Sequence, residues 1–350
     1  MRSFQQASAG IHIDRANAEV LDLILGFQIS QVIHVAASLG IADLLSADPK
    51  TSTELAAAAG AHPASLYRLM RALAAVGLFH EDDSGRFGLT VRGNTLRSDV
   101  PGSCAPTAEF YAGPSAWAAW GNLLHAVRTG ATAFDHVHGK TVWAYRAEHP
   151  EDSDAFDRAM AASAARFAEA LLSVCDFGRF ATVVDVGGGD GTLLASILAA
   201  NPRIRGTLFD QPRAVARAVS SLDALGVSDR CELLSGDFFV GIPGGADAYL
   251  LKNILHDWDD AASANILGAC RAAVTPGSRL LVCEHVTGSP NTGAPGKLMD
   301  LNMLVMTGGR ERSLAEFTSL LRQSRFRLLS VTPTSTPLSV IEAMPEGIAD

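Results

Sequence analysis

The pattern of apolar and polar positions changes near residue 180. Before it, residues 22–45 carry apolar residues at helical spacing with a wide apolar face, and residues 51–60 begin at Thr and Ser cap candidates. Residues 63–77 form a third periodic segment, and residues 79–90 predict two short strands around an Asp-Ser-Gly turn. Three helices followed by a hairpin are typical of a winged-helix domain.

After Thr182, strands alternate with helices, which predicts an α/β fold with a doubly wound, Rossmann-like parallel sheet whose last two strands close as a hairpin. The predicted strands are residues 182–187, 205–210, 231–239, 248–255, 279–286, 326–333 and 338–344. The intervening residues 101–180 look helical with irregular joins. We therefore expect three parts, namely residues 1–100, 101–180 and 181–350.

Charge and cysteine content narrow the classes of partner. The net charge is −9, the third predicted helix offers only Arg68 and Arg71 as bases, and the predicted wing is acidic, so we expect no nucleic-acid partner. The five cysteines show no CxxC spacing, which is typical of free thiols in a reducing cytoplasm. No histidine pair has metal-ligand spacing, so no metal site is predicted.

The first predicted helix raises the question of what covers it. No apolar run is expected to reach the 18 or so residues that a membrane span needs. A helix that is apolar over so much of its surface suits burial in a partner subunit, so we expect a homodimer through residues 1–100 and no membrane contact.

The first predicted strand of the sheet ends in Asp185 and a glycine loop, GGGDG at residues 187–191. Glycines such as Gly187 and Gly189 allow a tight turn and let a ligand approach the backbone. The spacing is GxGxG, whereas the dinucleotide pattern GxGxxG would need glycine at Thr192. The tighter loop suits a ligand without a pyrophosphate, such as S-adenosylmethionine.

The next two strand ends supply further parts of an adenosine site. Ligands of such sheets bind at the carboxyl ends of the strands. Asp210 lies about twenty residues past the glycines, where a carboxylate can accept hydrogen bonds from ribose hydroxyls. Asp237 can accept a hydrogen bond from an adenine amino group while Phe238 packs on the ring.

The fourth strand contains Lys252 and runs into His256 and Trp258. An imidazole with an ordinary pKa near 6.5 is neutral at pH 7 and can take a proton from a bound hydroxyl. His256 is therefore the candidate general base. A base of this kind works better when a carboxylate orients its second nitrogen, and either Glu284, at the end of the fifth strand, or Glu311 could do so.

These residues resemble the plant-type class I O-methyltransferase family, which includes bacterial enzymes that tailor aromatic polyketides and related antibiotics. The resemblance covers nearly the whole chain. It rests on five motifs in the family's order: VVDVGGGDG (183–191), RGTLFDQP (205–212), SGDFF (235–239), LKNILHDWDD (251–260) and DLNMLVMTGGRERS (300–313). The segment before Glu311 lacks the Asn-Pro common in plant members, which favours the bacterial branch.

The resemblance implies roles for individual residues. S-adenosylmethionine would be held by the glycine loop with Asp185, and by Asp210, Asp237, Phe238 and Lys252. His256 would be the base, flanked by Glu284 and Glu311. The acceptor pocket would be lined by Met160, Ser163, Trp258, Asn302, Met303 and Met306, with residues 101–180 contributing to it. Residues 1–100 would form a winged-helix-like dimerisation domain.

The sequence thus predicts a cytoplasmic O-methyltransferase acting on a hydroxylated aromatic metabolite. Three alternatives stay open. N-methylation is the nearest, a nicotinamide-dependent oxidoreductase is disfavoured by the glycine spacing, and a DNA-binding regulator would need a basic third helix.

Overall fold

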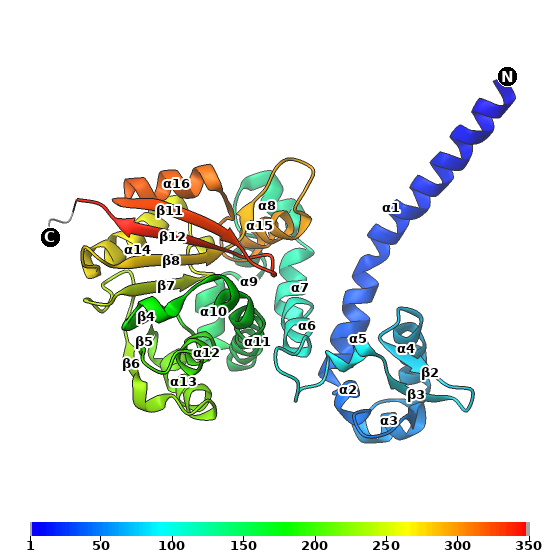
Figure 1. Cartoon of the computed structure of the whole chain (residues 1–350). Coiled ribbons are helices and arrows are strands. Elements are labelled where there is room, and N and C mark those ends of the chain that lie inside the picture. Colours follow the sequence, from blue (N-terminus) through cyan, green and yellow to red (C-terminus); the bar gives the residue numbers. More distant parts are fainter. Residues whose placement is uncertain (1, 348–350) are drawn as a thin grey trace. The chain divides into compact units, whose positions relative to one another are not determined.

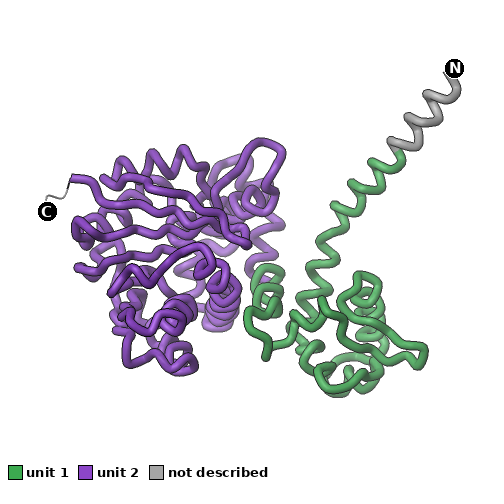
Figure 2. Tube along the Cα trace, viewed as in Figure 1, with its two compact units in different colours: residues 1–113 green, residues 114–350 purple. Residues whose placement is uncertain are grey.

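The computed structural model describes the backbone of residues 2–347 and the side chains of residues 14–347. The chain divides into two compact units, an N-terminal unit of residues 1–113 and a C-terminal unit of residues 114–350 (Figure 2). The three-part division expected from the sequence places its boundaries elsewhere and stays a prediction.

The N-terminal unit is helical with one small sheet (Figure 1). Its elements are α1 (Arg2–Ser38), α2 (Ile41–Leu44), β1 (Lys50–Thr51), α3 (Ser52–Ala59), α4 (Pro63–Ala75), β2 (Phe79–Glu81), β3 (Arg86–Leu89), α5 (Val91–Asn94) and α6 (Ala105–Tyr111). Strands β2 and β3 form the predicted hairpin, and β1 adds to it in the order β1-β3-β2. The predicted helix over residues 22–45 is interrupted after Ser38, because Gly40 takes a left-handed φ of 61°.

Most of the large apolar side chains described on helix α1 are exposed. The exposed large apolar residues of α1 are Val20, Leu21, Leu23, Ile24, Leu25, Phe27, Ile29 and Val35. Within Asp14–Ser38, an 18-residue window reaches a mean hydropathy of 1.6 and only 11% of it is buried, so by length and composition this helix could cross a membrane. The sequence contains no unbroken apolar run of that length, as expected, but counting unbroken runs missed this helix, whose average hydropathy is high although polar residues interrupt it.

The C-terminal unit contains a seven-stranded sheet covered by helices (Figure 1). Its helices are α7 (Pro114–Trp120), α8 (Leu123–Thr129), α9 (Ala133–His138), α10 (Val142–Glu148), α11 (Pro150–Val174), α12 (Thr192–Ala200), α13 (Pro212–Ala224), α14 (Asp260–Ala273), α15 (Ala294–Met306) and α16 (Leu314–Gln323), with short 3-10 turns at Phe177–Arg179, Ser228–Arg230 and Leu255–Asp257. Its strands are β4 (Thr182–Val186), β5 (Arg205–Asp210), β6 (Cys231–Ser235), β7 (Ala248–Lys252), β8 (Arg279–Glu284), β9 (Val286–Thr287), β10 (Arg312–Ser313), β11 (Phe326–Pro333) and β12 (Ser339–Pro345).

The sheet order is β11-β12-β8-β7-β4-β5-β6. Strands β6, β5, β4, β7 and β8 are parallel, and β12 pairs antiparallel with both β8 and β11. The predicted doubly wound sheet and its terminal hairpin are confirmed. The chain order reverses between β4 and β7, so the switch point lies where the candidate site was expected.

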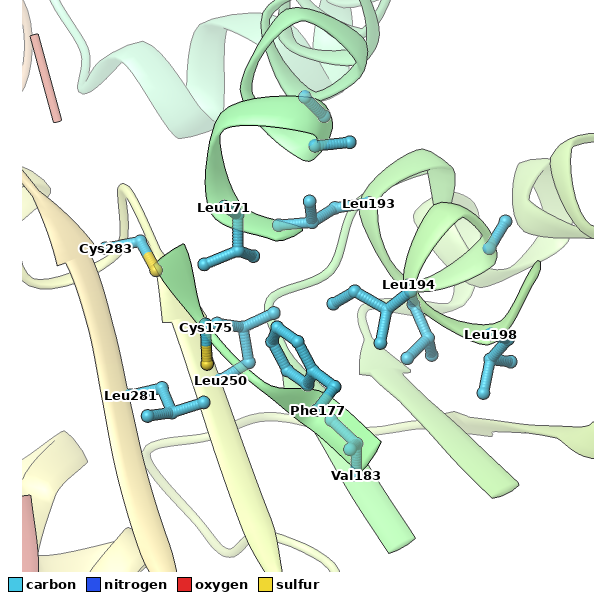
Figure 3. Close-up of a cluster of buried hydrophobic side chains, with 14 of the residues drawn as sticks. Leu171, Cys175, Phe177, Val183, Leu193, Leu194, Leu198, Leu250, Leu281 and Cys283 are labelled. Atoms are coloured by element: carbon cyan, nitrogen blue, oxygen red, sulfur yellow. The ribbon is translucent and has the colours of Figure 1, made fainter. Parts of the chain in front are cut away.

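Two apolar layers hold the sheet between its helices. On one face, Leu171 of α11 and Leu193 of α12 pack with Phe177 and Leu250 (Figure 3). On the other face, Tyr249 and Leu251 of β7 pack against α14 and α16. Strand β7 is buried on both faces, which explains its unbroken apolar sequence.

A second, two-stranded sheet pairs β9 with β10 in parallel, through Arg312 opposite Val286 and Ser313 opposite Thr287. This pair was not predicted, because strands of two residues carry no periodic pattern. It brings the segment after α15 alongside the segment after β8, and so places Glu311 near Glu284.

Candidate active site

The glycine loop follows β4 and leads into α12. Gly187 and Gly189 have φ of 70° and 61°, in the left-handed region that favours glycine. A Cβ at Gly187 would lie 2.4 Å from Ile254 Cδ1, whereas a Cβ at Gly189 would meet nothing within 4 Å. The loop therefore leaves open space at Gly189, and backbone there can be approached closely by a ligand.

Two carboxyls lie beside this loop, the buried Asp185 and the half-buried Asp210. Asp210 Oδ2 accepts a hydrogen bond from Gly189 N–H at 2.8 Å, and Asp210 Oδ1 accepts one from Gln211 N–H at 2.6 Å. These two hydrogen bonds lower the pKa of Asp210, but burial outweighs them and raises it. Asp185 Oδ2 is buried without a hydrogen-bond partner among the described residues, and burial followed by the charge of Asp210 raises the pKa of Asp185 to about 7. A buried carboxylate oxygen without a hydrogen-bond partner fits a binding site in which a ligand with hydroxyl groups and a positive charge provides the missing partner.

The third strand end is more open. Asp237 is exposed, and its Oδ1 accepts a hydrogen bond from Phe239 N–H at 2.8 Å. The Phe238 ring is half-buried and meets the Trp258 ring edge-on at 6.3 Å. Phe238 and Trp258 thus connect the expected adenine end of the site with the turn that carries His256.

Lys252 ends β7 beneath the site. Its Nζ donates to Ser163 Oγ of α11 at 3.2 Å. Burial lowers the pKa of Lys252 to about 8, although Cys283 and Asp185 act in the opposite direction. The structure thereby joins one expected cofactor residue, Lys252, with one expected acceptor-side residue, Ser163.

His256 lies in the 3-10 turn Leu255–Asp257 and is only 6% exposed. Its Nδ1 lies 2.8 Å from Glu311 Oε1, so the Nδ1–H donates to that carboxylate. Glu284 Oε1 accepts from the backbone N–H groups of Leu255 and His256, at 2.6 and 3.2 Å. Both expected partners are therefore present with different geometry: Glu311 contacts the ring and Glu284 holds the backbone.

The ring is surrounded by carboxyl groups. Asp257 Oδ1 lies 3.9 Å from His256 Nε2. Burial lowers the pKa of His256, but Asp257, Glu311 and Glu284 together raise it to about 9. The expectation of an imidazole with an ordinary pKa was wrong, because Asp257 adds a third carboxyl to the Glu284 and Glu311 that the sequence suggested. Burial also raises the pKa of Glu284, to about 7.

The expected acceptor-side residues separate into two groups. Met160 and Ser163 are half-buried on α11, and Trp258 is half-buried after the turn, with its ring stacked 6.1 Å from the Trp143 ring. The buried residues are Asn302, Met303 and Met306 of α15. Asn302 Oδ1 accepts from Trp120 Nε1 at 3.0 Å, and Met306 packs in an apolar cluster with α7 and α9. These two side chains already have protein partners, and their contact with an acceptor stays a prediction.

Sequence reasoning missed Asp257 and Arg146. Asp257 follows His256 directly, and a carboxylate beside a candidate base was an available signal. Arg146 of α10 is 6% exposed, pairs with Asp152 at 3.5 Å, and its charge counteracts the burial that raises the pKa of Asp257. Arg146 is far from every motif in sequence, so no signal marked it.

Comparison with known proteins identifies relatives of both units. Family models for an O-methyltransferase domain and an O-methyltransferase dimerisation domain match residues 120–327 and 21–99. A phenazine O-methyltransferase of Lysobacter antibioticus is 42% identical over 93% of this chain and 95% of its own. An 8-amino-8-demethylriboflavin N,N-dimethyltransferase of Streptomyces davaonensis is 37% identical over 95% and 96%.

Solved structures agree with these relatives. The crystal structure of LaPhzM superposes with a TM-score of 0.91 at 42% identity, covering 94% of this chain and 99% of that one. NcsB1, an O-methyltransferase from neocarzinostatin biosynthesis, was solved with S-adenosylmethionine and 2-hydroxy-5-methyl naphthoic acid. It matches with a TM-score of 0.75 at 34% identity, covering 91% and 96%.

Glu311→Gln tests the electrostatics of the imidazole. The substitution removes a carboxylate that raises the pKa of His256, so that pKa is expected to fall from about 9 toward its ordinary value of 6.5. The measurement is an NMR titration of the imidazole nitrogens. Glu169→Gln, the same charge change at an exposed position of α11, is the control and should leave the titration unchanged. A His256 titration that stays near 9 in Glu311→Gln would contradict the assignment.

Proposed function

Since the chain belongs to the O-methyltransferase family, it is an S-adenosylmethionine-dependent O-methyltransferase, and we propose that His256 is its general base toward an aromatic hydroxyl. The observation that supports this role most directly is the 2.8 Å contact between His256 Nδ1 and Glu311 Oε1. It commits Nδ1 to the carboxylate and leaves Nε2 as the nitrogen that can exchange a proton with an acceptor. The bacterial relatives favour an acceptor from aromatic natural-product biosynthesis, of the kind that leads to antibiotics.

The cofactor would be held by the residues at the carboxyl ends of β4, β5, β6 and β7. When bound, S-adenosylmethionine supplies an electrophilic methyl group that the acceptor oxygen takes by in-line displacement of the sulfur. Asp210 has one acceptor position left on each oxygen for ribose hydroxyls, and the open backbone at Gly189 lets the ligand approach. Asp237 and Phe238 would hold the adenine, while Asp185 and Lys252 lie deeper, beneath the glycine loop.

The protein's own residues handle the proton. With a pKa of about 9, His256 is mostly protonated at pH 7, so its imidazolium favours an acceptor that binds as the oxyanion. An acceptor that binds as a neutral hydroxyl would instead give its proton to the small fraction of His256 that is neutral at pH 7. In either order the proton ends on Nε2, between the acceptor oxygen and Asp257, and Glu311 stabilises the resulting imidazolium through Nδ1. The half-buried rings of Trp143 and Trp258 would limit water access beside it.

N-methylation is the second candidate, because the riboflavin-type relative acts on an amine. A carboxyl-surrounded base fits oxygen better, since a neutral amine attacks through its lone pair before it loses a proton. The oxidoreductase and DNA-binding alternatives are set aside by the family match.

The N-terminal unit carries the dimerisation domain, and we propose a homodimer in which the exposed face of α1 is covered by a second copy, not by a membrane. We also propose a cytoplasmic location, no nucleic-acid partner, and the three-part division with residues 101–180 contributing to the acceptor pocket. The position of Ser163 and Trp143 beside Lys252 and Trp258 supports that last point.

His256→Ala is expected to lower kcat by about 10²–10⁴-fold, because the variant loses a positioned base. Affinity for S-adenosylhomocysteine should change little, since the ring contacts Glu311 and Asp257, neither of which is expected to hold the adenosine. Both are measured with an acceptor selected from hydroxylated aromatic compounds, and His80→Ala, exposed in β2, is the control. A wild-type rate for His256→Ala on an unactivated phenol would refute the base assignment.

Asp210→Asn is expected to weaken S-adenosylhomocysteine binding about 10–100-fold, because hydrogen bonds to a charged group contribute about 1.5–3 kcal/mol. Calorimetric titration gives the affinity directly. Asp229→Asn, at an exposed position of the turn Ser228–Arg230, makes the same change far from the loop. Equal affinities for the Asp210 variant and the wild type would remove Asp210 from the site.

Replacing Leu23 and Phe27 together by Glu is expected to give a monomer. These side chains are 80% and 51% exposed on α1, and charges there oppose burial in a second copy. Light scattering after size exclusion should show twice the chain mass for the wild type and the single mass for the variant. A variant that keeps the dimer mass would place the interface elsewhere.

A further inference from the structure

We propose that Arg312 is a positioning residue that holds the His256 turn in its reactive place by clamping the carbonyl groups on either side of it. The inference rests on the proposed role of His256 as base. Arg312 lies in the motif of residues 300–313, directly after Glu311, and no role was predicted for it.

The contacts of Arg312 bracket the turn. Its side chain is fully buried, and Nη1 donates to Leu255 O while Nη2 donates to Trp258 O, both at 2.9 Å. Nη2 also donates to Ser263 Oγ at 3.0 Å, and Ser263 Oγ itself donates to Leu255 O at 3.1 Å. The guanidinium therefore ties the residues before and after His256 to the first turns of α14.

The residues directly before Arg312 also contact the His256 turn. Arg310 N–H donates to His256 O at 2.8 Å, and Glu311 Oε1 contacts His256 Nδ1 at the same distance. A Cβ at Gly309 would lie 2.0 Å from His256 O, so the two segments approach each other more closely than any side chain would allow. Three consecutive residues thus hold the backbone and the ring of His256.

The contacts of Arg312 indicate that it positions the turn more than it contributes to folding stability. Asp260 Oδ1 accepts from Arg312 Nε at 2.9 Å, but the Asp260 side chain is 61% exposed and balances a buried charge poorly. Burying a cation is costly, and buried ion pairs are weak contributors to folding stability. The planar fork of arginine can address several acceptors at once, whereas lysine offers a single flexible ammonium. A side chain that must donate hydrogen bonds to two separate carbonyl groups at this position is therefore better provided by arginine than by lysine.

The experiment compares Arg312→Lys and Arg312→Gln with Ser263→Ala and the control Arg230→Gln. Arg230 provides a matched clamp, because its guanidinium donates to the carbonyls of Leu198, Asn201 and Ile204 at the opposite ends of the strands. Each variant is characterised by S-adenosylhomocysteine affinity, by kcat and KM, and by NMR titration of His256 in the S-adenosylhomocysteine complex.

The carboxyls that set the pKa of His256 are Asp257 of its own turn, Glu311 before β10 and Glu284 of β8. Arg146 of α10 acts on Asp257, Arg312 acts on Glu284, and His285 after β8 is itself affected by His256. If the clamp positions the turn, losing it separates His256 from Glu311, and the pKa of His256 falls from about 9 toward 6.5. Loss of a positive charge alone would act in the opposite direction and raise that pKa.

In both Arg312 variants we expect kcat to fall about 10²-fold, because a displacement of the base by about 1 Å has an effect of this size. The affinity for S-adenosylhomocysteine should stay within about threefold of the wild-type value. Ser263→Ala should also lower the pKa of His256, but by less. This variant still tests the clamp if Arg312→Gln fails to fold. A wild-type titration and kcat for Arg312→Lys would overturn the clamp, as would an equal titration shift in Arg230→Gln. The His256 titration needs no acceptor, so it tests the clamp separately from the proposed methyl transfer.

Discussion

The contact between His256 Nδ1 and Glu311 Oε1 is the interaction on which the account of this molecule depends. It orients the ring, commits one nitrogen to a carboxylate and leaves the other for chemistry. It can form only because the segment after α15 runs against the His256 turn, with glycine at position 309 and the β9–β10 ladder holding the two segments in register. Sheet topology, close backbone approach and proton transfer are therefore parts of one arrangement.

Burial gives this edge of the sheet its reactivity. Asp185, Lys252, Glu284 and His256 have pKa values of about 7, 8, 7 and 9, each moved away from its ordinary value. Burial is the largest cause for the first three, whereas at His256 the surrounding carboxyls outweigh it. Such values concentrate at functional sites, because groups near neutrality exchange protons readily. Glu284 and Asp185 also keep buried oxygens without hydrogen-bond partners in the described part of the chain, which marks where ligands are expected to complete the site.

The sequence was sufficient for the sheet and for the residues at its strand ends, because both depend on periodicity and chain order. Asp185, Asp210, Asp237 and His256 were predicted as site residues in this way, since each lies at or just after the end of an apolar run. It was insufficient for groups brought in from distant elements. Arg146 lies on a short helix without a motif, and Arg312 contacts residues more than fifty positions away in sequence. The raised pKa of His256 depends on three carboxyls whose convergence only the fold reveals. The wide apolar face of α1 was predicted, but its membrane-span hydropathy was not, because polar residues interrupt the apolar positions in sequence.

The central claim is that the free nitrogen of His256 meets the acceptor oxygen. A crystal structure of the chain with S-adenosylhomocysteine and a methylated or methylatable aromatic hydroxyl compound tests it most directly. We expect His256 Nε2 at about 2.6–3.2 Å from the reacting oxygen, with that oxygen directed at the cofactor sulfur. An acceptor oxygen aligned with the sulfur but beyond reach of Nε2, with no water between them, would contradict it.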